Sequence, residues 1–313
     1  MASVFHKLVL PVLVLCCCLF SCAPKSTHAH PLKICKFDQI YQLGDSISDT
    51  GNLIREVPIG AATAFARLPY GETFFKNATG PRAAGLSFLP PYKNLDAADF
   101  EHGVNFAVAG STALPSKVLA AQHIFSPVTT SSLNVQLDWM FNHFTSICRN
   151  SRDCVEKLQN ALFMVGEIGG NDYNYAIFQG KTMEELRSMV PHVVATIVDA
   201  ARKVIEVGEL QKAIHTLKQE KPNAVIVYGD YDNAYKFLLQ VATSHGLERE
   251  RACCGTGGKY NFNMTRMCGG AGVEVCSDPE RYMSWDGVHL TQQGYKIMAA
   301  WLVNNIFPHL CHI

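Results

Sequence analysis

The sequence has no excess of charge of either sign, since its 313 residues include 27 Lys and Arg and 27 Asp and Glu. It has no basic stripe, no internal repeat and no low-complexity tract. Without a basic surface, nucleic acid and anionic membranes are poor candidates for a partner. The length corresponds to one large domain or two small ones. The composition is therefore that of an ordinary globular protein, whose function must be argued from particular residues.

The sequence also lacks a run near its start that could cross a bilayer comfortably, which takes about 20 apolar residues in a helix. The apolar stretch from Leu8 to Phe20 follows Lys7 and precedes small and polar residues ending at Ala29. This order is typical of a secretory signal peptide. We therefore expect residues 1–29 to be a signal peptide and residues 30–313 to be the mature domain. An N-terminal membrane anchor is the less favoured alternative.

Four of the twelve cysteines lie in that segment, and eight remain: Cys35, Cys148, Cys154, Cys253, Cys254, Cys268, Cys276 and Cys311. An even number in an exported chain favours disulfides. Cys148 and Cys154 could close a small loop, and the region 253–276 could be stapled internally. Zinc is the alternative, but the later cluster has neither a CxxC pair nor a histidine at ligand spacing. We expect no metal and no cofactor.

Two segments, Asn77-Ala78-Thr79 and Asn263-Met264-Thr265, have the acceptor pattern for N-glycosylation. The pattern is informative only if the chain is exported, because the modification takes place in the secretory pathway. Unmodified surface loops remain an alternative at both positions. With an exported chain, the sequence predicts a glycoprotein.

Short apolar runs alternate with segments of helical periodicity. We expect strands at 37–43, 103–108, 161–165 and 224–228, and helices at 133–144 and 291–306, the last one capped by Thr291. This alternation predicts an α/β fold with a parallel sheet covered by helices on both faces. Sites in such sheets lie beyond the carboxyl ends of the strands. Ser46, Gly110 and Asn171 each follow a predicted strand, so we expect them to converge on one edge.

Residues 182–220 do not fit the alternation, because they are helical in character and only Pro191 and Gly208 interrupt them. At about 1.5 Å per residue this segment would form a rod of roughly 58 Å, longer than such a domain accommodates. We expect the helix to bend or break, with Gly208 as the favoured point. A strand that would normally separate two helices here is not recognisable.

The candidate catalytic residues lie near the two ends of the chain, in Gly44-Asp45-Ser46 and in Asp286-Gly287-Val288-His289. A serine hydroxyl is a weak nucleophile until a base takes its proton, and a histidine works best as that base when a carboxylate fixes its tautomer. Asp286 stands three residues before His289, close enough to orient the imidazole. These residue types predict acyl transfer. The serine lies in Gly-Asp-Ser rather than Gly-x-Ser-x-Gly, which argues against an α/β-hydrolase elbow.

These motifs occur in the same order in one known family. The chain resembles the plant GDSL esterase/lipase family of SGNH hydrolases, and within it the group that contains alkaloid acetyl esterases and sinapine esterase. The resemblance covers nearly the whole mature chain and rests on Gly44–Asn52, Asn105–Gly110, Gly169–Asp172, Val227–Tyr231, Cys253–Asn261 and Trp285–Thr291. It implies a three-layer αβα, flavodoxin-like fold with a central parallel sheet.

The resemblance also implies a role for five residues. Ser46 would be the nucleophile, His289 the general base, and Asp286 the residue that orients it. The backbone N–H groups of Ser46 and Gly110 and the side-chain amide of Asn171 would hold the oxyanion. Taken singly, Gly110 and Asn171 would also fit ordinary turns.

The chain departs from the family in two places. A segment is short between Pro81 and Phe88, and another between Gly208 and Glu209, where members carry a further strand and a substrate-side loop. The resemblance therefore implies a sheet that lacks one strand. Alternative splicing or a faulty gene model would account for both gaps.

We expect a secreted esterase that hydrolyses acetyl or other small acyl esters of plant metabolites, with the vacuole or the cell wall as possible destinations. The alternatives are an acyltransferase of the same fold and a catalytically impaired product of the two gaps. A glycosidase would need two acids flanking one bond, and the sequence singles out no such pair. No nucleic acid and no stable membrane anchor are expected.

Overall fold

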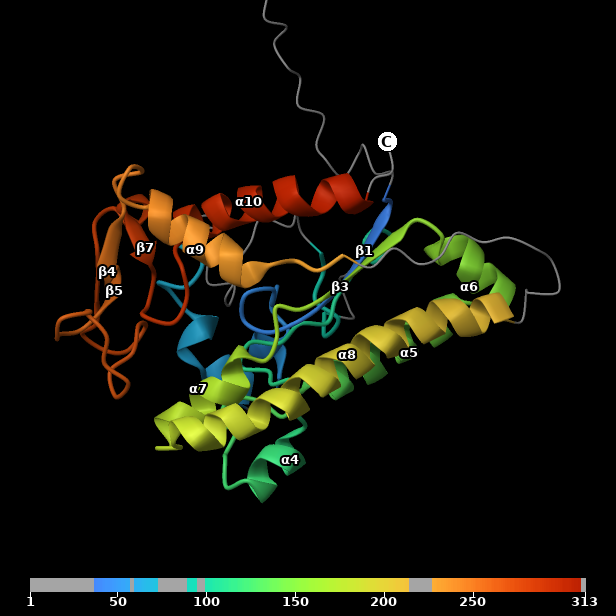
Figure 1. The fold of residues 1–313 in the computed structure, drawn as a ribbon, viewed down its shortest axis with the longest axis horizontal. Helices are drawn as coiled ribbons and strands as arrows, with labels where there is room; N and C mark the ends of the chain where they lie inside the picture. The colour runs from blue at the N-terminus through green and yellow to red at the C-terminus, as the bar shows by residue number, and fades with distance from the viewer. Residues whose placement is uncertain (1–36, 57–58, 73–88, 95–98, 214–226, 311–313) are drawn as a thin grey trace, which may run out of the picture. The chain divides into compact units, whose positions relative to one another are not determined.

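The computed structural model describes residues 37–56, 59–72, 89–94, 99–213 and 227–310 (Figure 1). At its centre lies a parallel sheet of β1 (Gln39–Leu43), β2 (Gly103–Asn105) and β3 (Ala161–Val165), in the order β2-β1-β3. β1 is the middle strand and pairs with β3 from Gln39 opposite Ala161 to Leu43 opposite Val165. This parallel pairing brings the carboxyl ends of the three strands to one edge.

Helices cover both faces of the sheet. Figure 1 shows α5 (Leu133–Ile147), α7 (Gly170–Phe178) and α8 (Met183–Ala213) on one side, and α9 (Tyr231–Val241) and α10 (Gln292–Leu310) on the other. The α/β fold with a parallel sheet flanked by helices is thus confirmed. Smaller elements connect these layers: η1 (Leu53–Arg55), α3 (Ile59–Ala62), η2 (Ala64–Ala66), α4 (Ser116–Ala121), α6 (Ser151–Leu158) and η3 (Pro279–Arg281).

Apolar spacing explains why α5 packs where it does. Leu133, Leu137, Met140 and Phe144 recur on one face and are all buried against the sheet core. Burial of each such side chain stabilises the fold by about 1.5–3 kcal/mol. The start of α10 also follows the prediction, because the hydroxyl oxygen of Thr291 accepts the N–H of Gly294 at 3.2 Å.

The predicted strands are found with changed limits. β2 ends at Asn105, yet the N–H of Phe106 still bonds the carbonyl of Gln42 at 2.7 Å and that of Val108 bonds Gly44 at 3.2 Å. Most of the segment predicted as a strand at 224–228 lies outside the described residues, as do the signal peptide and the shortened segment at 81–88. Within the described part of the chain the central sheet has three strands.

The expected break at Gly208 is wrong. α8 runs for 31 residues, through Pro191 and Gly208, to Ala213. In the part of the helix before Gly208, a stripe of buried residues three, four or seven positions apart (Leu186, Met189, Val193, Ala200 and Val204) packs against the sheet core. This burial outweighs the hydrogen bond that Pro191 cannot donate.

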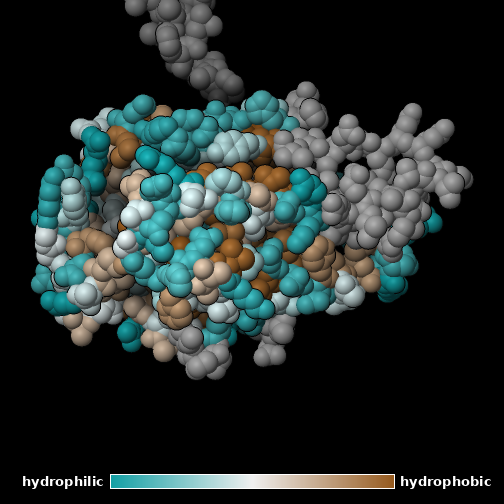
Figure 2. Space-filling view, turned by 60° about the horizontal axis from the view of Figure 1, so that its bottom comes forward, coloured by the Kyte–Doolittle hydropathy of each residue, from teal (hydrophilic) through white to brown (hydrophobic). Residues whose placement is uncertain are grey.

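A second apolar stripe on α8 remains exposed. Val190, Val194 and Val198 follow one another at intervals of one turn and are 44%, 52% and 48% exposed. Figure 2 shows apolar side chains gathered across one face of the molecule. Among the described helices none is both long and apolar enough to cross a membrane.

Three disulfides join the cysteines predicted to pair locally. They are Cys148–Cys154, Cys253–Cys276 and Cys254–Cys268, whereas Cys35 and Cys311 lie outside the described residues. The last two bonds lie within residues 253–276, which also contain the small sheet of β5 (Cys254–Gly255) with β6 (Glu274–Val275). β4 (Glu248–Ala252) precedes this segment and pairs with β7 (Tyr282–Ser284), which follows it. We call residues 253–276 the stapled loop.

Candidate active site

Ser46 stands in a tight turn directly after β1. The carbonyl of Asp45 accepts the N–H groups of Ser48 and Asp49, and the Asp45 side chain accepts the N–H of Ile47 at 3.1 Å. Asp49 has a structural role, since its buried carboxylate accepts the N–H groups of Gly51, Asn52, Leu53 and Ala109. The turn is therefore fixed from both sides, and the sheet edge presents the serine hydroxyl.

Asp286 and His289 lie in a short loop between β7 and α10. Its base is closed by the N–H of Trp285 bonding the carbonyl of His289 at 2.8 Å. The stapled loop holds the same segment, because the N–H of Cys253 bonds Ser284 and that of Cys254 bonds Trp285. Gly287 has a φ of +88°, and a side chain there would overlap the ring of Phe262. The sequence thus dictates the turn that brings Asp286 back onto His289.

The structure brings the three side chains into one hydrogen-bonded chain. His289 Nε2 lies 2.8 Å from Ser46 Oγ, and His289 Nδ1 lies 2.7 Å from Asp286 Oδ2. Because Nδ1 faces a carboxylate, it carries the proton and Nε2 is left as the acceptor for the serine hydroxyl. Asp286 Oδ1 accepts the N–H groups of Val288 at 2.9 Å and of His289 at 2.7 Å. This is the geometry that activates a serine oxygen.

Burial and charge compete at this pair. Burial disfavours the charge of Asp286, but the charge of His289 and the hydrogen bonds from His289 and Val288 outweigh it and lower the pKa of Asp286 to about 2. For His289, burial disfavours the charged ring, but Asp286 and, more weakly, Glu167 reverse this and raise its pKa above 6.5. A charged aspartate therefore faces the histidine at neutral and mildly acidic pH.

Two backbone donors beside the site have no acceptor among the described residues. Within the described residues the N–H groups of Ser46 and Gly110 make no hydrogen bond. Gly110 has a φ of +81°, and a side chain there would overlap Val128. The carbonyl of Gly110 is held by the hydroxyl of Tyr175 at 2.7 Å. The turn is thus locked with its N–H free to bind an anionic oxygen.

Asn171 lies in the first turn of α7. Its side-chain amide donates to the carbonyl of Ser111 at 2.9 Å and to Asp45 Oδ2 at 3.4 Å. The second of these bonds is long and therefore weak, so that N–H is available to a closer acceptor. The next residue, Asp172, is buried and accepts the N–H groups of Ala113 and Leu114, which fixes the loop after Gly110.

The site contains residues that the sequence analysis did not single out. The hydroxyl of Tyr70 donates to Asp286 Oδ2 at 2.9 Å, and the ring of Phe65 stands edge-on to His289 at 6.5 Å between centroids. Burial raises the pKa of Glu167, a residue that follows β3. The strand-edge argument that selected Asn171 would have found Glu167. No sequence signal points to Tyr70, which lies 216 residues from its partner.

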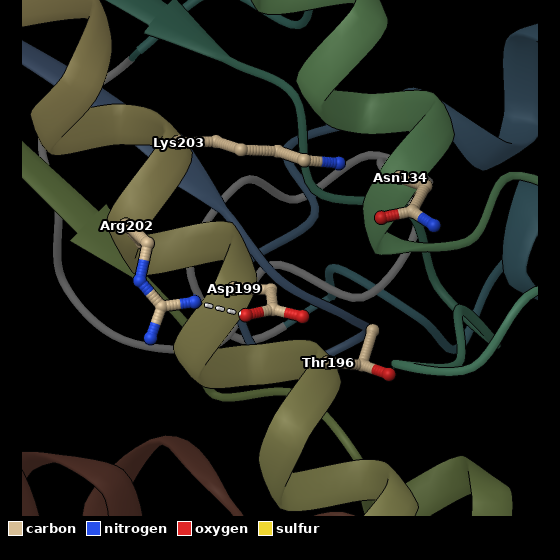
Figure 3. A pocket seen from close by; sticks show the side chains of 5 residues that line it. All are labelled: Asn134, Thr196, Asp199, Arg202 and Lys203. Atoms are coloured by element: carbon tan, nitrogen blue, oxygen red, sulfur yellow. Dashed lines mark hydrogen bonds and ion pairs between the residues drawn. The ribbon is translucent and has the colours of Figure 1, made fainter.

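A separate hollow of about 240 Å³ lies between α5 and α8 (Figure 3). Asn134 comes from α5, and Thr196, Asp199, Arg202 and Lys203 come from α8. Asp199 is paired with Arg202, and none of the five predicted site residues lines this hollow. In the described part of the chain, no group of three or more His, Cys, Asp or Glu residues could hold a metal ion.

Comparison with known proteins agrees with this geometry. The family model of the GDSL-like lipase/acylhydrolases matches residues 40–209 and 205–302. Acetylajmalan esterase 2 of Rauvolfia serpentina is 37% identical over 338 residues, which cover 89% of this chain and 93% of the relative. GDSL esterase/lipase At5g03980 of Arabidopsis thaliana is 37% identical over 330 residues, covering 90% and 93%.

These alignments bear on the two gaps. An alignment of 338 residues is longer than the 313-residue chain itself, so the Rauvolfia serpentina relative has sequence that this chain lacks. The family model matches in two stretches that meet at residues 205–209. That junction coincides with the shortened segment inferred after Gly208.

The raised pKa of His289 can be measured directly. In a ring-proton NMR titration of the full mature chain, we expect His289 to titrate above 6.5 and its pKa to fall in Asp286→Asn, because the carboxylate that raises it is gone. A reaction in which His289 accepts a proton should then lose rate as the pH falls through that raised pKa. A wild-type pKa below 6.5 would show that burial outweighs the pairing.

Proposed function

Because the chain belongs to the GDSL-like lipase/acylhydrolase family of carboxylic ester hydrolases, we propose that it cleaves esters of small plant metabolites through an acyl-enzyme on Ser46. The observation that carries the proposal is the continuous hydrogen-bonded chain from Ser46 Oγ through His289 to Asp286, with distances of 2.8 and 2.7 Å. Ser46 and His289 are 243 residues apart in the sequence. A serine that only capped a turn would have no reason to lie beside this histidine.

In the acylation step, Ser46 Oγ attacks the ester carbonyl while His289 Nε2 takes the hydroxyl proton. Asp286 stabilises the imidazolium that forms. The tetrahedral intermediate then collapses, the bond to the alcohol oxygen breaks, and His289 returns its proton to that oxygen. The free alcohol leaves, and the acyl group remains on Ser46.

In the deacylation step a water molecule replaces the alcohol. His289 takes a proton from the water, whose oxygen attacks the acyl carbon, and then returns that proton to Ser46 Oγ as the acid departs. In both steps the carbonyl oxygen becomes negative. The N–H groups of Ser46 and Gly110 and the amide of Asn171 are proposed to bind it, since the two N–H groups have no other acceptor among the described residues.

We propose that the acyl part of the ester is an acetyl or another small acyl group. Two apolar side chains flank the machinery: Phe65 stands beside His289, and Val128 packs against Gly110. The relatives from Rauvolfia serpentina carry the name acetylajmalan esterase, which is consistent with a small acyl group here.

Two alternatives keep the same site. In an acyltransferase a second alcohol, rather than water, would take the acyl group from Ser46, and product analysis with an added alcohol separates free acid from a new ester. If the two missing segments make the protein catalytically impaired, its site would form no acyl-enzyme. The aligned hydrogen bonds of Ser46 and His289 favour an active enzyme.

The nucleophile can be tested directly. We expect a fluorophosphonate probe to label the purified mature chain once, on Ser46, and Ser46→Ala to abolish both labelling and ester hydrolysis without a change in fold. Ser48→Ala, in the same turn, is the matched control and should remain reactive. A folded wild-type protein that the probe does not label would favour the impaired product.

The oxyanion donor gives a quantitative expectation. Asn171→Ala should lower kcat about 100- to 1,000-fold and change KM far less, because the donor acts on charge that develops in the transition state. Asn174→Ala, one turn further along α7, serves as the control and should stay within about twofold of wild type. A loss of less than fivefold in Asn171→Ala would assign oxyanion binding to the backbone donors alone.

We also propose that the protein enters the secretory pathway. Three disulfides in the described residues are bonds that persist there. Asn263 is exposed, and its side-chain oxygen accepts the N–H of Thr265 at 2.9 Å and its hydroxyl at 2.8 Å, so the acceptor segment lies open on the stapled loop.

Expression of the full chain in plant cells tests this proposal. Mass spectrometry should find a mature amino terminus near residue 30 and a mass that falls on glycosidase treatment. Thr265→Ala should remove the glycan at Asn263. A product that retains residues 1–29 and carries no glycan would contradict export.

A further inference from the structure

The segment 59–72 reaches the catalytic pair from a distant part of the chain. The Tyr70 hydroxyl donates a hydrogen bond of 2.9 Å to Asp286 Oδ2, the same oxygen that accepts His289 Nδ1–H at 2.7 Å. Both side chains are buried, with 4% of Tyr70 and 1% of Asp286 exposed, so water does not compete for this oxygen. We propose that Tyr70 is a positioning residue, which fixes the Asp286 carboxylate and tunes the basicity of His289.

The hydrogen bonds of Asp286 divide into two sets. Oδ1 is held by the N–H groups of Val288 and His289, which belong to the same loop. Among the described residues, Oδ2 has one hydrogen-bond partner outside that loop, the Tyr70 hydroxyl. Without the Tyr70 hydroxyl, the hydrogen bonds described for this carboxylate would all come from its own loop, and the carboxylate could move with that loop. The tyrosine therefore ties the plane of the carboxylate to the rest of the fold.

Tyr70 is itself held in place. Its ring meets Phe65 edge-on at 4.9 Å and Trp285 at 6.4 Å, and it packs in a cluster with Cys253, Cys254 and Cys268 of the stapled loop. Burial, together with the charge of Asp286, raises the pKa of Tyr70, so its hydroxyl remains a donor at every pH at which the fold is stable. A rigid ring with a permanent donor is suited to orienting a carboxylate.

The charge of Asp286 decides in which direction the pKa of His289 changes when the Tyr70 hydroxyl is removed. A donor to Oδ2 disperses part of the carboxylate charge, which weakens the attraction of Asp286 for a protonated imidazole. Removal of the hydroxyl should therefore raise the pKa of His289. Among the described residues, Glu167 also acts on the charge of His289 and Tyr295 lies within the influence of Asp286, and the substitution at Tyr70 leaves both groups in place.

The experiment compares Tyr70→Phe with Tyr282→Phe in the mature chain. Tyr282 packs on the same cluster, and its hydroxyl makes no hydrogen bond with the described residues, so it is a matched control. In Tyr70→Phe we expect the His289 pKa, measured by NMR, to rise by about half a unit to one unit. We also expect kcat on the alkaline plateau to fall about tenfold through looser orientation. Tyr282→Phe should change neither quantity.

A double substitution separates positioning from general stabilisation. If Tyr70 acts through Asp286, Tyr70→Phe should have no further effect on kcat in an Asp286→Ala background. An unchanged His289 pKa and an unchanged kcat in Tyr70→Phe, whatever the change in Tm, would overturn the proposal. Equal losses of kcat in both backgrounds would do the same.

This inference rests on the proposed function for its effect on rate, but the NMR titration does not. If wild-type protein is not labelled at Ser46 and hydrolyses no ester, the proposed function fails. The influence of Tyr70 on the His289 pKa is still measured in that case, and it decides the inference separately.

Discussion

The buried contact between Asp286 and His289 is the constraint on which the rest of the site depends. A carboxylate that is 1% exposed is tolerated only when hydrogen bonds and a neighbouring cation compensate for the loss of water. Here four donors supply that compensation: two N–H groups of the loop, the imidazole and the Tyr70 hydroxyl. The arrangement that makes the charge tolerable also fixes the imidazole toward Ser46.

The fold assembles the site around this contact from three separate parts of the chain. The edge of the parallel sheet presents Ser46 after β1, and the loop before α10 presents Asp286 and His289. Tyr70 approaches from the segment 59–72. The stapled loop connects the last two parts, because its cysteines pack on Tyr70 and its backbone pairs with Ser284 and Trp285. Packing around Tyr70 and orientation of Asp286 are therefore one structural unit.

Much of this could be predicted from sequence because the signals are local. Motif order identified the family, and the rule that parallel strands end at one edge brought Ser46, Gly110 and Asn171 together. The path of α8 could not be predicted from Pro191 and Gly208 alone, since the helix continues through both and its buried apolar stripe, which runs up to Val204, outweighs the effect of Pro191. Tyr70 was missed because only the tertiary fold shows what its hydroxyl meets. The roles of the five predicted residues stay predictions until the substitutions are made.

The pairing of two adjacent cysteines with different partners has a further consequence. Cys253 and Cys254 are bonded to Cys276 and Cys268, and their own N–H groups bond the backbone immediately before Asp286. A thiol reductant that opens both bonds would thus loosen the platform beneath the carboxylate without touching any reacting atom. Recombinant protein made in a reducing cytosol would start from that loosened platform, so oxidative folding is part of making a competent catalyst.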